Sequence, residues 1–226
     1  MLTIDILLYI VAFIITIWAQ TKVQNAYQHF AKVANERQLS GYAVARDILN
    51  RNGLYDVQVQ VSQNGLLSDH YDPKTNTVNL SPKVYNDASI ASVAIAAHEV
   101  GHAMQYAENY SMVGVRNSLL PLAIISGHAG WIVLIIGLAA RIDVLFLAGI
   151  VMVGIIGLFQ LFTLPLEFDA SKRALALLSD GGYVNTDEVA DAKEMLSAAA
   201  LTYVAALVAT LLQIMRFVLI YGRRRN

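Results

Sequence analysis

Long apolar stretches dominate the pattern of this chain. Residues 119–140 and 144–164 contain no Asp, Glu, Lys or Arg, and a helix needs about 20 residues to cross a bilayer. A third stretch covers Leu196–Met215, and a shorter one covers Ile6–Ala19. The pattern therefore predicts four transmembrane helices.

The first apolar stretch has a second interpretation, because a secretory signal peptide is also a short apolar run. A signal peptide carries basic residues before that run and small residues at its cleavage site. No Lys or Arg precedes Ile6, and residues Ile15–Ala19 make a poor cleavage site. We therefore expect a membrane span.

Between the first and second apolar stretches, the pattern of apolar and polar residues changes to that of short helices and strands, which predicts a small α+β domain. Ser40 is a suitable N-cap for a helix over Gly41–Arg51, and Gly53 is a suitable stop. The other predicted elements, in chain order, are a helix over 21–38 that continues the first span, a strand over 55–61, a turn at Asn64-Gly65, a loop over 69–73, a strand over 75–80, a short helix from Ser81-Pro82, and a helix over 89–107.

Composition narrows the possible functions. Hydrophobic residues make up 56% of the chain and charged residues 15%, which is outside the usual range of soluble domains. The net charge is −1 and no basic patch is present, so we expect no nucleic-acid partner. The chain has no cysteine, so any zinc site must use histidine and carboxylate ligands.

The pentapeptide His98–His102, with the sequence His-Glu-Val-Gly-His, is the clearest candidate for chemistry. Residues four apart on a helix share a face, so both histidines can bind one metal ion. Glu99 is turned by about 100° and can act as general base on a water. The alternative is a helix with two ordinary histidines. The small, apolar residues 88–97 before the motif indicate a buried helix, where these polar groups need a partner such as a metal.

A catalytic zinc ion has three protein ligands, and several residues could be the third. Glu108 would be rotated by roughly 280° from His98 on a continuous helix and would miss the metal. His128 lies inside the second span, where it is either functional or a neutral histidine bonded to a neighbouring helix. His70 is expected in an exposed or substrate-facing loop, and His29 at the surface.

Glu167 is the favoured third ligand. It follows the third span and Pro165, which can start a new helix. On that helix Glu167 shares a face with small residues that permit close packing on the metal helix: Ala170, Ser171 and Ala174. The alternative is an interfacial carboxylate paired with Lys172 or Arg173. Two spans separate His102 from Glu167, and two crossings return the chain to the same side of the membrane.

Four segments resemble the bacterial neutral zinc metallopeptidases of the YugP type, which are integral membrane proteins. The segments are 67–73 (LSDHYDP), 96–105 (AAHEVGHAMQ), 164–171 (LPLEFDAS) and 192–203 (AKEMLSAAALTY), and the resemblance covers essentially the whole chain. It implies zinc ligands at His98, His102 and Glu167 and a catalytic Glu99. More distantly, the chain is similar to HtpX-like membrane proteases. Ser171 stands where those proteins carry an Asp that can orient a ligand histidine.

We therefore expect a mainly α integral membrane protein with a small α+β, zincin-like catalytic domain that carries a short β-sheet. The expected parts are a first transmembrane helix (1–20), the catalytic domain (21–118), a transmembrane hairpin (119–164), the Glu-ligand helix and connecting segment (165–195), and a last transmembrane helix with a basic tail (196–226). The tail Arg223–Arg225 is expected to act as a topology or headgroup anchor.

The expected function is hydrolysis of protein or peptide substrates at or near the membrane by a zinc-dependent, gluzincin-like endopeptidase with one Zn²⁺ ion. Zinc would polarise the scissile carbonyl, and Glu99 would move the proton of the water. Candidate oxyanion stabilisers are His70, Tyr71 and Arg173.

The alternative function is that of a membrane scaffold or adaptor with a structural zinc, although such sites usually have four protein ligands and often cysteine. The similarity to HtpX-like proteases favours a cytoplasmic site, with the bilayer and the substrate as partners.

Overall fold

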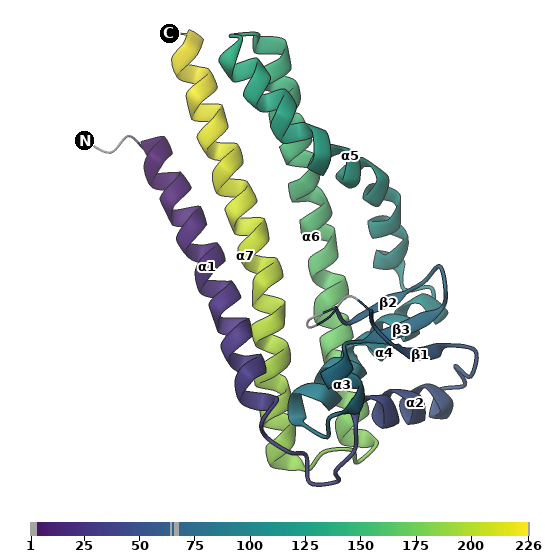
Figure 1. The fold of residues 1–226 in the computed structure, drawn as a ribbon. Helices are drawn as coiled ribbons and strands as arrows, with labels where there is room; N and C mark the ends of the chain where they lie inside the picture. Colours follow the sequence, from purple (N-terminus) through teal and green to yellow (C-terminus); the bar gives the residue numbers. More distant parts are fainter. Residues whose placement is uncertain (1–3, 64, 66–67, 226) are drawn as a thin grey trace. The chain divides into compact units, whose positions relative to one another are not determined.

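The computed structural model describes residues 4–63, 65 and 68–225 (Figure 1). Within these residues it has seven α-helices and one three-stranded sheet, which confirms the prediction of a mainly α protein with a short β-sheet. The predicted turn at Asn64-Gly65 involves Asn64, which lies outside the described residues. The start of the first predicted span (1–3), the segment 66–67, Asn226 and the side chains of Arg224 and Arg225 also lie outside them.

The chain forms two compact units. The helical unit contains residues 1–21, 111–165 and 201–226, and the site-bearing unit contains residues 22–110 and 166–200. Three helices have residues in both units: α1 (Ile4–Phe30), α6 (Asp143–Asp180) and α7 (Thr186–Arg225).

Within the described part of the chain, four helices are long and apolar enough to cross a membrane: α1, α5 (Ser111–Ala139), α6 and α7. Large apolar side chains on them face outward; Ile14 and Ile132, for example, are 58% and 59% exposed. Such surfaces are costly in water and favourable in lipid. The four predicted transmembrane helices are therefore present in the structure.

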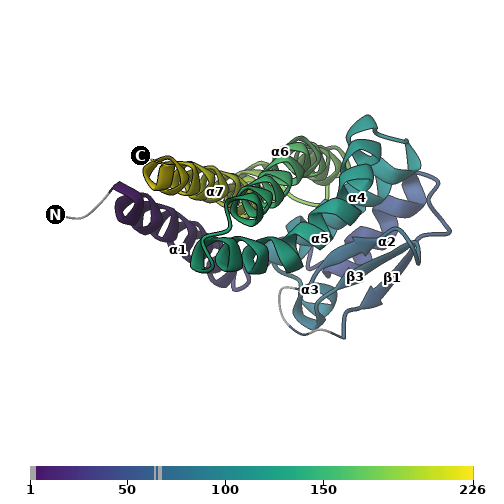
Figure 2. The same cartoon turned by 90° about the horizontal axis from the view of Figure 1, so that it is seen from above.

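Within the helical unit, α7 lies against both α1 and α6 (Figure 2). Arg223 of α7 forms an ion pair of 2.6 Å with Asp5 of α1, and two turns earlier the Arg216 guanidinium lies over the Tyr9 ring. Phe146 of α6 and Phe217 of α7 pack edge to face. The helices are thus joined by polar pairs at one end and by aromatic packing beside it.

The site-bearing unit is built around α4 (Ile90–Ala107), which packs against α2 (Gly41–Arg51). α2 begins at its predicted cap, since the Ser40 hydroxyl accepts a hydrogen bond from the amide of Ala43. α4 is capped by Ser89, whose hydroxyl accepts a hydrogen bond from the amide of Ser92. A short helix, α3 (Pro82–Asn86), follows Ser81 as predicted.

The sheet has the order β1-β3-β2 and comprises β1 (Gln58–Val61), β2 (His70–Asp72) and β3 (Thr77–Leu80). β3 pairs in parallel with β1 and antiparallel with β2. The prediction of a loop over 69–73 was wrong at 70–72, because these residues pair with β3 through a turn. In that turn Asp72 accepts a hydrogen bond from the amide of Lys74, and Asn76 has a φ of +52°.

Two further helix predictions were wrong at their ends. The helix predicted over 21–38 stops at Phe30, because the following segment bonds instead to the start of α4: the amide of Asn35 donates to the Ala88 carbonyl, and that of Ile90 to the Val33 carbonyl. Pro165 does not start a new helix but lies inside the continuous α6. It stands at the boundary between the two units.

The last helix begins ten residues before the apolar stretch that predicted it. Asn185 and Glu188 cap it reciprocally, since the Asn185 side chain accepts from the amide of Glu188 and the Glu188 carboxylate accepts from the amide of Asn185. The polar first turns of α7 therefore belong to the site-bearing unit, before the apolar part begins.

Candidate metal centre

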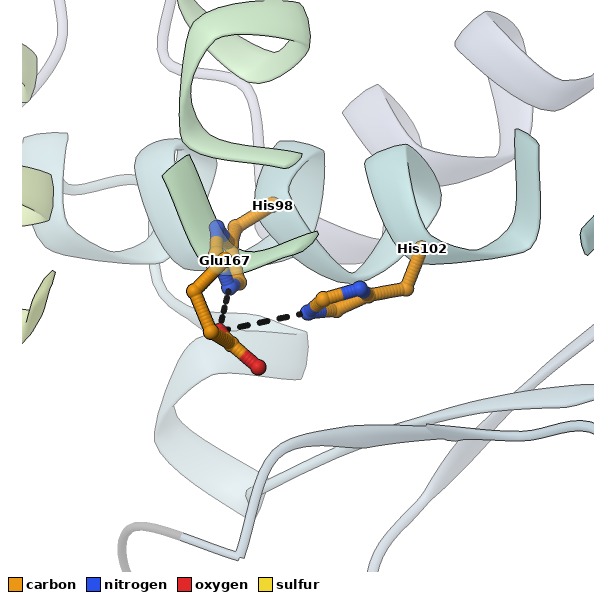
Figure 3. A group of neighbouring side chains, drawn as sticks. All are labelled: His98, His102 and Glu167. Atoms are coloured by element: carbon orange, nitrogen blue, oxygen red, sulfur yellow. Dashed lines mark ion pairs between the residues drawn. The ribbon is translucent and has the colours of Figure 1, made fainter. Parts of the chain in front are cut away.

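Two helices of the site-bearing unit bring His98, His102 and Glu167 together (Figure 3). The Glu167 Oε2 atom lies 3.4 Å from His98 Nε2 and 3.5 Å from His102 Nε2. The three potential ligand atoms lie within 4.8 Å of one another. All three side chains are largely buried, with exposed fractions of 15%, 14% and 9%.

The close crossing of α4 and α6 makes this convergence possible. Gly101 lies between the two histidines on α4, and a Cβ atom there would come within 2.9 Å of the Ala170 carbonyl oxygen. On α6, Ala170 and Ala174 are fully buried, as expected of a small-residue face that follows Glu167. The small size of Gly101, Ala170 and Ala174 lets the two helix backbones approach closely enough for the Glu167 carboxylate to reach both imidazoles.

The donor set fits a zinc ion. A tetrahedral ion with bonds of 2.0–2.1 Å places neighbouring ligand atoms about 3.3 Å apart, close to the two separations between the carboxylate and the imidazoles. The Glu167 Oε2 atom is buried and accepts no hydrogen bond of good geometry among the described residues. Such an atom is costly to bury unless a cation satisfies it. Two imidazoles and a carboxylate also suit zinc by ligand type, and three protein ligands are those of an open, catalytic site.

The charge of Glu167 changes the protonation of His102. Burial alone would lower the pKa of His102, but the adjacent, negatively charged Glu167 carboxylate raises the pKa to about 9. In the metal-free site a proton on His102 therefore balances the Glu167 carboxylate. A metal ion that binds there must displace this proton.

The second ring nitrogen of each histidine has its own partner. His98 Nδ1 lies 3.2 Å from the Ser171 hydroxyl, and His102 Nδ1 lies 2.9 Å from the Gln105 amide oxygen. Both rings thus direct Nε2 at Glu167. Gln105 was not predicted from the sequence as a partner of His102. The signal was its spacing, since a residue three positions after His102 on a helix lies beside it.

Glu99 is also buried, with an exposed fraction of 8%. Its Oε2 atom accepts a hydrogen bond of 3.0 Å from the backbone amide of Tyr71, the middle residue of β2. Strand β2 thereby holds one oxygen of the Glu99 carboxylate in place.

Three other side chains singled out from the sequence make no polar contact with the ligand cluster among the described residues. His70 bonds to the Ser68 carbonyl and, with Asn79, lines a polar pocket of about 400 Å³ on the sheet. The Tyr71 hydroxyl donates to Asn76. The Arg173 guanidinium forms ion pairs with Asp169 (2.6 Å) and Glu108 (2.7 Å).

The remaining ligand candidates lie elsewhere. Glu108 caps the C-terminus of α4 and pairs with Arg173. His29 lies in the last turn of α1, edge-on to Phe30. His128 belongs to α5 of the helical unit and is exposed. Among the described residues, only His98, His102 and Glu167 form a group able to hold a metal ion.

Comparison with known proteins gives two matches and one absence. A family model described as "Putative neutral zinc metallopeptidase" matches residues 5–222. The "Putative membrane protease YugP" of Bacillus subtilis (strain 168) is 39% identical over 223 residues, which cover 98% of this chain and 99% of the relative. No solved structure matches the chain.

Proposed function

Because the chain belongs to this zinc metallopeptidase family, we propose that it is a membrane-embedded, zinc-dependent endopeptidase. Its substrates are proteins or peptides presented at or near the bilayer. The observation that carries the proposal is the convergence of His98, His102 and Glu167 on one point, with the carboxylate of Glu99 next in the chain to the first of them. This is the arrangement of a site that hydrolyses amide bonds with one zinc ion.

Each residue has a role in this proposal. His98 and His102, through Nε2, and Glu167, through its carboxylate, hold one Zn²⁺ ion. When bound, the ion supplies a Lewis acid for the scissile carbonyl and lowers the pKa of water. Glu99 accepts the proton of the attacking water and delivers it to the leaving amine. The Tyr71 amide fixes one oxygen of Glu99, which orients the carboxylate without neutralising it.

The proposed division of the chain follows from this site. Residues 21–118 carry the motif and residues 165–195 carry the third ligand, while the segments 1–20, 119–164 and 196–226 hold the enzyme in the bilayer. We place the site on the cytoplasmic side. Substrates would then be cytoplasmic segments of membrane proteins or peptides that reach the bilayer surface.

The test is the substitution Glu99→Gln in the full-length protein, purified in detergent. It should leave the zinc content at one ion per chain and reduce cleavage of an unfolded, labelled protein by about 10²–10⁴-fold, the usual contribution of a general base. The matched control is Glu194→Gln, an exposed carboxylate of the same unit, which should cleave at the wild-type rate. Cleavage by Glu99→Gln at the wild-type rate would reject the role of Glu99.

A further inference from the structure

Gln105 is a fully buried polar residue that links the two helices of the site. Its amide oxygen lies 2.9 Å from His102 Nδ1. Its amide nitrogen donates two hydrogen bonds of 2.8 Å, one to the Leu166 carbonyl and one to the Asp169 carboxylate. One side chain of α4 thus contacts a ligand histidine and the residue that precedes the ligand Glu167.

The partners of Gln105 determine which way its amide points. The carbonyl oxygen of Leu166 has no hydrogen and can only accept. Asp169 also accepts, because its Oδ2 atom is held by the Arg173 guanidinium at 2.6 Å. The NH₂ group of Gln105 must therefore face α6, and its oxygen must face His102. An amide oxygen only accepts, so the hydrogen in this contact belongs to His102 Nδ1.

We propose that Gln105 is a positioning residue that keeps a hydrogen on His102 Nδ1 and so keeps the lone pair of Nε2 available to the metal ion. The inference rests on the proposed role of His102 as a ligand. Second partners of this kind fix the tautomer and orientation of metal-bound histidines. Because the same amide bonds to the Leu166 carbonyl, Gln105 also holds the α6 segment that carries Glu167 against α4.

His98 has no partner that fixes its tautomer in this way. The partner of His98 Nδ1 is the Ser171 hydroxyl, which can donate or accept and so does not select a tautomer. The hydroxyl contact is also longer, at 3.2 Å against 2.9 Å. We therefore expect loss of Gln105 to affect zinc binding more strongly than loss of the Ser171 hydroxyl.

The test uses the full-length protein and two measurements. The first is zinc affinity, by competition with a chromophoric chelator. Gln105→Leu, which removes both acceptor and donors, should weaken zinc binding by about 10–100-fold, the usual cost of losing such a partner. Ser171→Ala should weaken it less. The control Tyr183→Phe removes a hydrogen bond to Asp47 in the same unit, away from the ligand cluster, and should leave zinc affinity unchanged.

A paired substitution separates positioning from general damage. Gln105→Glu keeps an acceptor for His102 but sets a second carboxylate against Asp169 and the Leu166 carbonyl, so it should also weaken zinc binding. Adding Asp169→Asn supplies an amide that can donate to the new carboxylate and still accept from Arg173. The double variant should then regain affinity relative to Gln105→Glu. An equal or greater loss in the double variant would contradict the proposal.

The second measurement needs no variant to fold and no metal. In the metal-free wild type with ¹⁵N-labelled histidine, at a pH where the His102 ring is neutral, its single ring hydrogen should lie on Nδ1 and exchange slowly. A His102 Nδ1 without hydrogen, or unchanged zinc affinity in Gln105→Leu, would overturn the proposal while leaving the zinc site intact. Failure of the wild type to bind zinc at all would instead reject the proposed function, and the NMR result would still decide the role of Gln105.

Discussion

Gly101 of α4 lies so close to Ala170 of α6 that a Cβ atom on Gly101 would come within 2.9 Å of the Ala170 carbonyl oxygen. Contacts this short between a Cβ and a backbone atom require the backbone to move. The crossing lies between His98 and His102 along α4 and one turn after Glu167 along α6. Any separation of the two helices here therefore increases the distance between the carboxylate and the imidazoles.

Gly101→Ala should accordingly impair zinc binding. Alanine favours a helix more than glycine does, so the helix itself should form, but α4 and α6 must separate by a few tenths of an ångström or more. We expect zinc affinity to fall at least tenfold, about 1.4 kcal/mol, as measured by chelator competition.

The control for this substitution is Gly114→Ala. Gly114 also lies inside a helix, but a Cβ atom there would meet no atom within 4 Å. It should bind zinc like the wild type. If both variants bind zinc equally well, the tight crossing does not control the geometry of the site.

The identity of the third ligand can be tested by metal analysis. Glu167→Ala removes the only carboxylate that the described residues place beside both imidazoles, so zinc should be lost on dialysis. Glu108→Ala should retain one zinc per chain, because Glu108 lies at the C-cap of α4 and pairs with Arg173. The reverse result would assign the third ligand to Glu108.

The raised pKa of His102 predicts how the stability of the metal-free protein depends on pH. The pKa rises from its ordinary value of 6.5 to about 9, because the adjacent negative charge of Glu167 outweighs the effect of burial. Between these values the folded protein holds a proton that the unfolded chain has released. The stabilisation is therefore complete below pH 6.5 and is lost as the pH rises to about 9.

Zinc binding should show the opposite trend, since the ion displaces the same proton. Apparent zinc affinity should rise with pH, by up to about tenfold per unit for one released proton, and level off near pH 9. Chelator competition across this range and thermal unfolding of the metal-free form measure the two trends. A flat pH profile in both would contradict coupling between His102 and Glu167.

The proposed orientation can be tested with reporters at the C-terminus. Four spans place the C-terminus opposite the site-bearing unit, so a cytoplasmic site predicts an external C-terminus. An alkaline phosphatase fusion at Asn226 should be active, and a green fluorescent protein fusion should be dark. The opposite pair of signals would place the site outside the cytoplasm.

Local patterns in the sequence determined the membrane spans, the capped helices α2 and α4, and the shared face of His98 and His102. Each depends on residues within a few turns of one another, so periodicity and capping predict them. The small residues that share a helix face with Glu167 are also a local pattern. That Glu167 is a zinc ligand stays a prediction.

Only the tertiary structure decided the features that depend on partners distant in the chain. The helix α1 ends at Phe30 because residues 33–35 form hydrogen bonds with the start of α4. Residues 70–72 form a strand because they pair antiparallel with β3. Helix spacing places Gln105 beside His102, but its amide is oriented by Leu166 and Asp169, more than sixty residues later, which accept both of its hydrogen bonds. A buried amide must be satisfied wherever its partners lie, and the chain's local pattern carries no record of those partners.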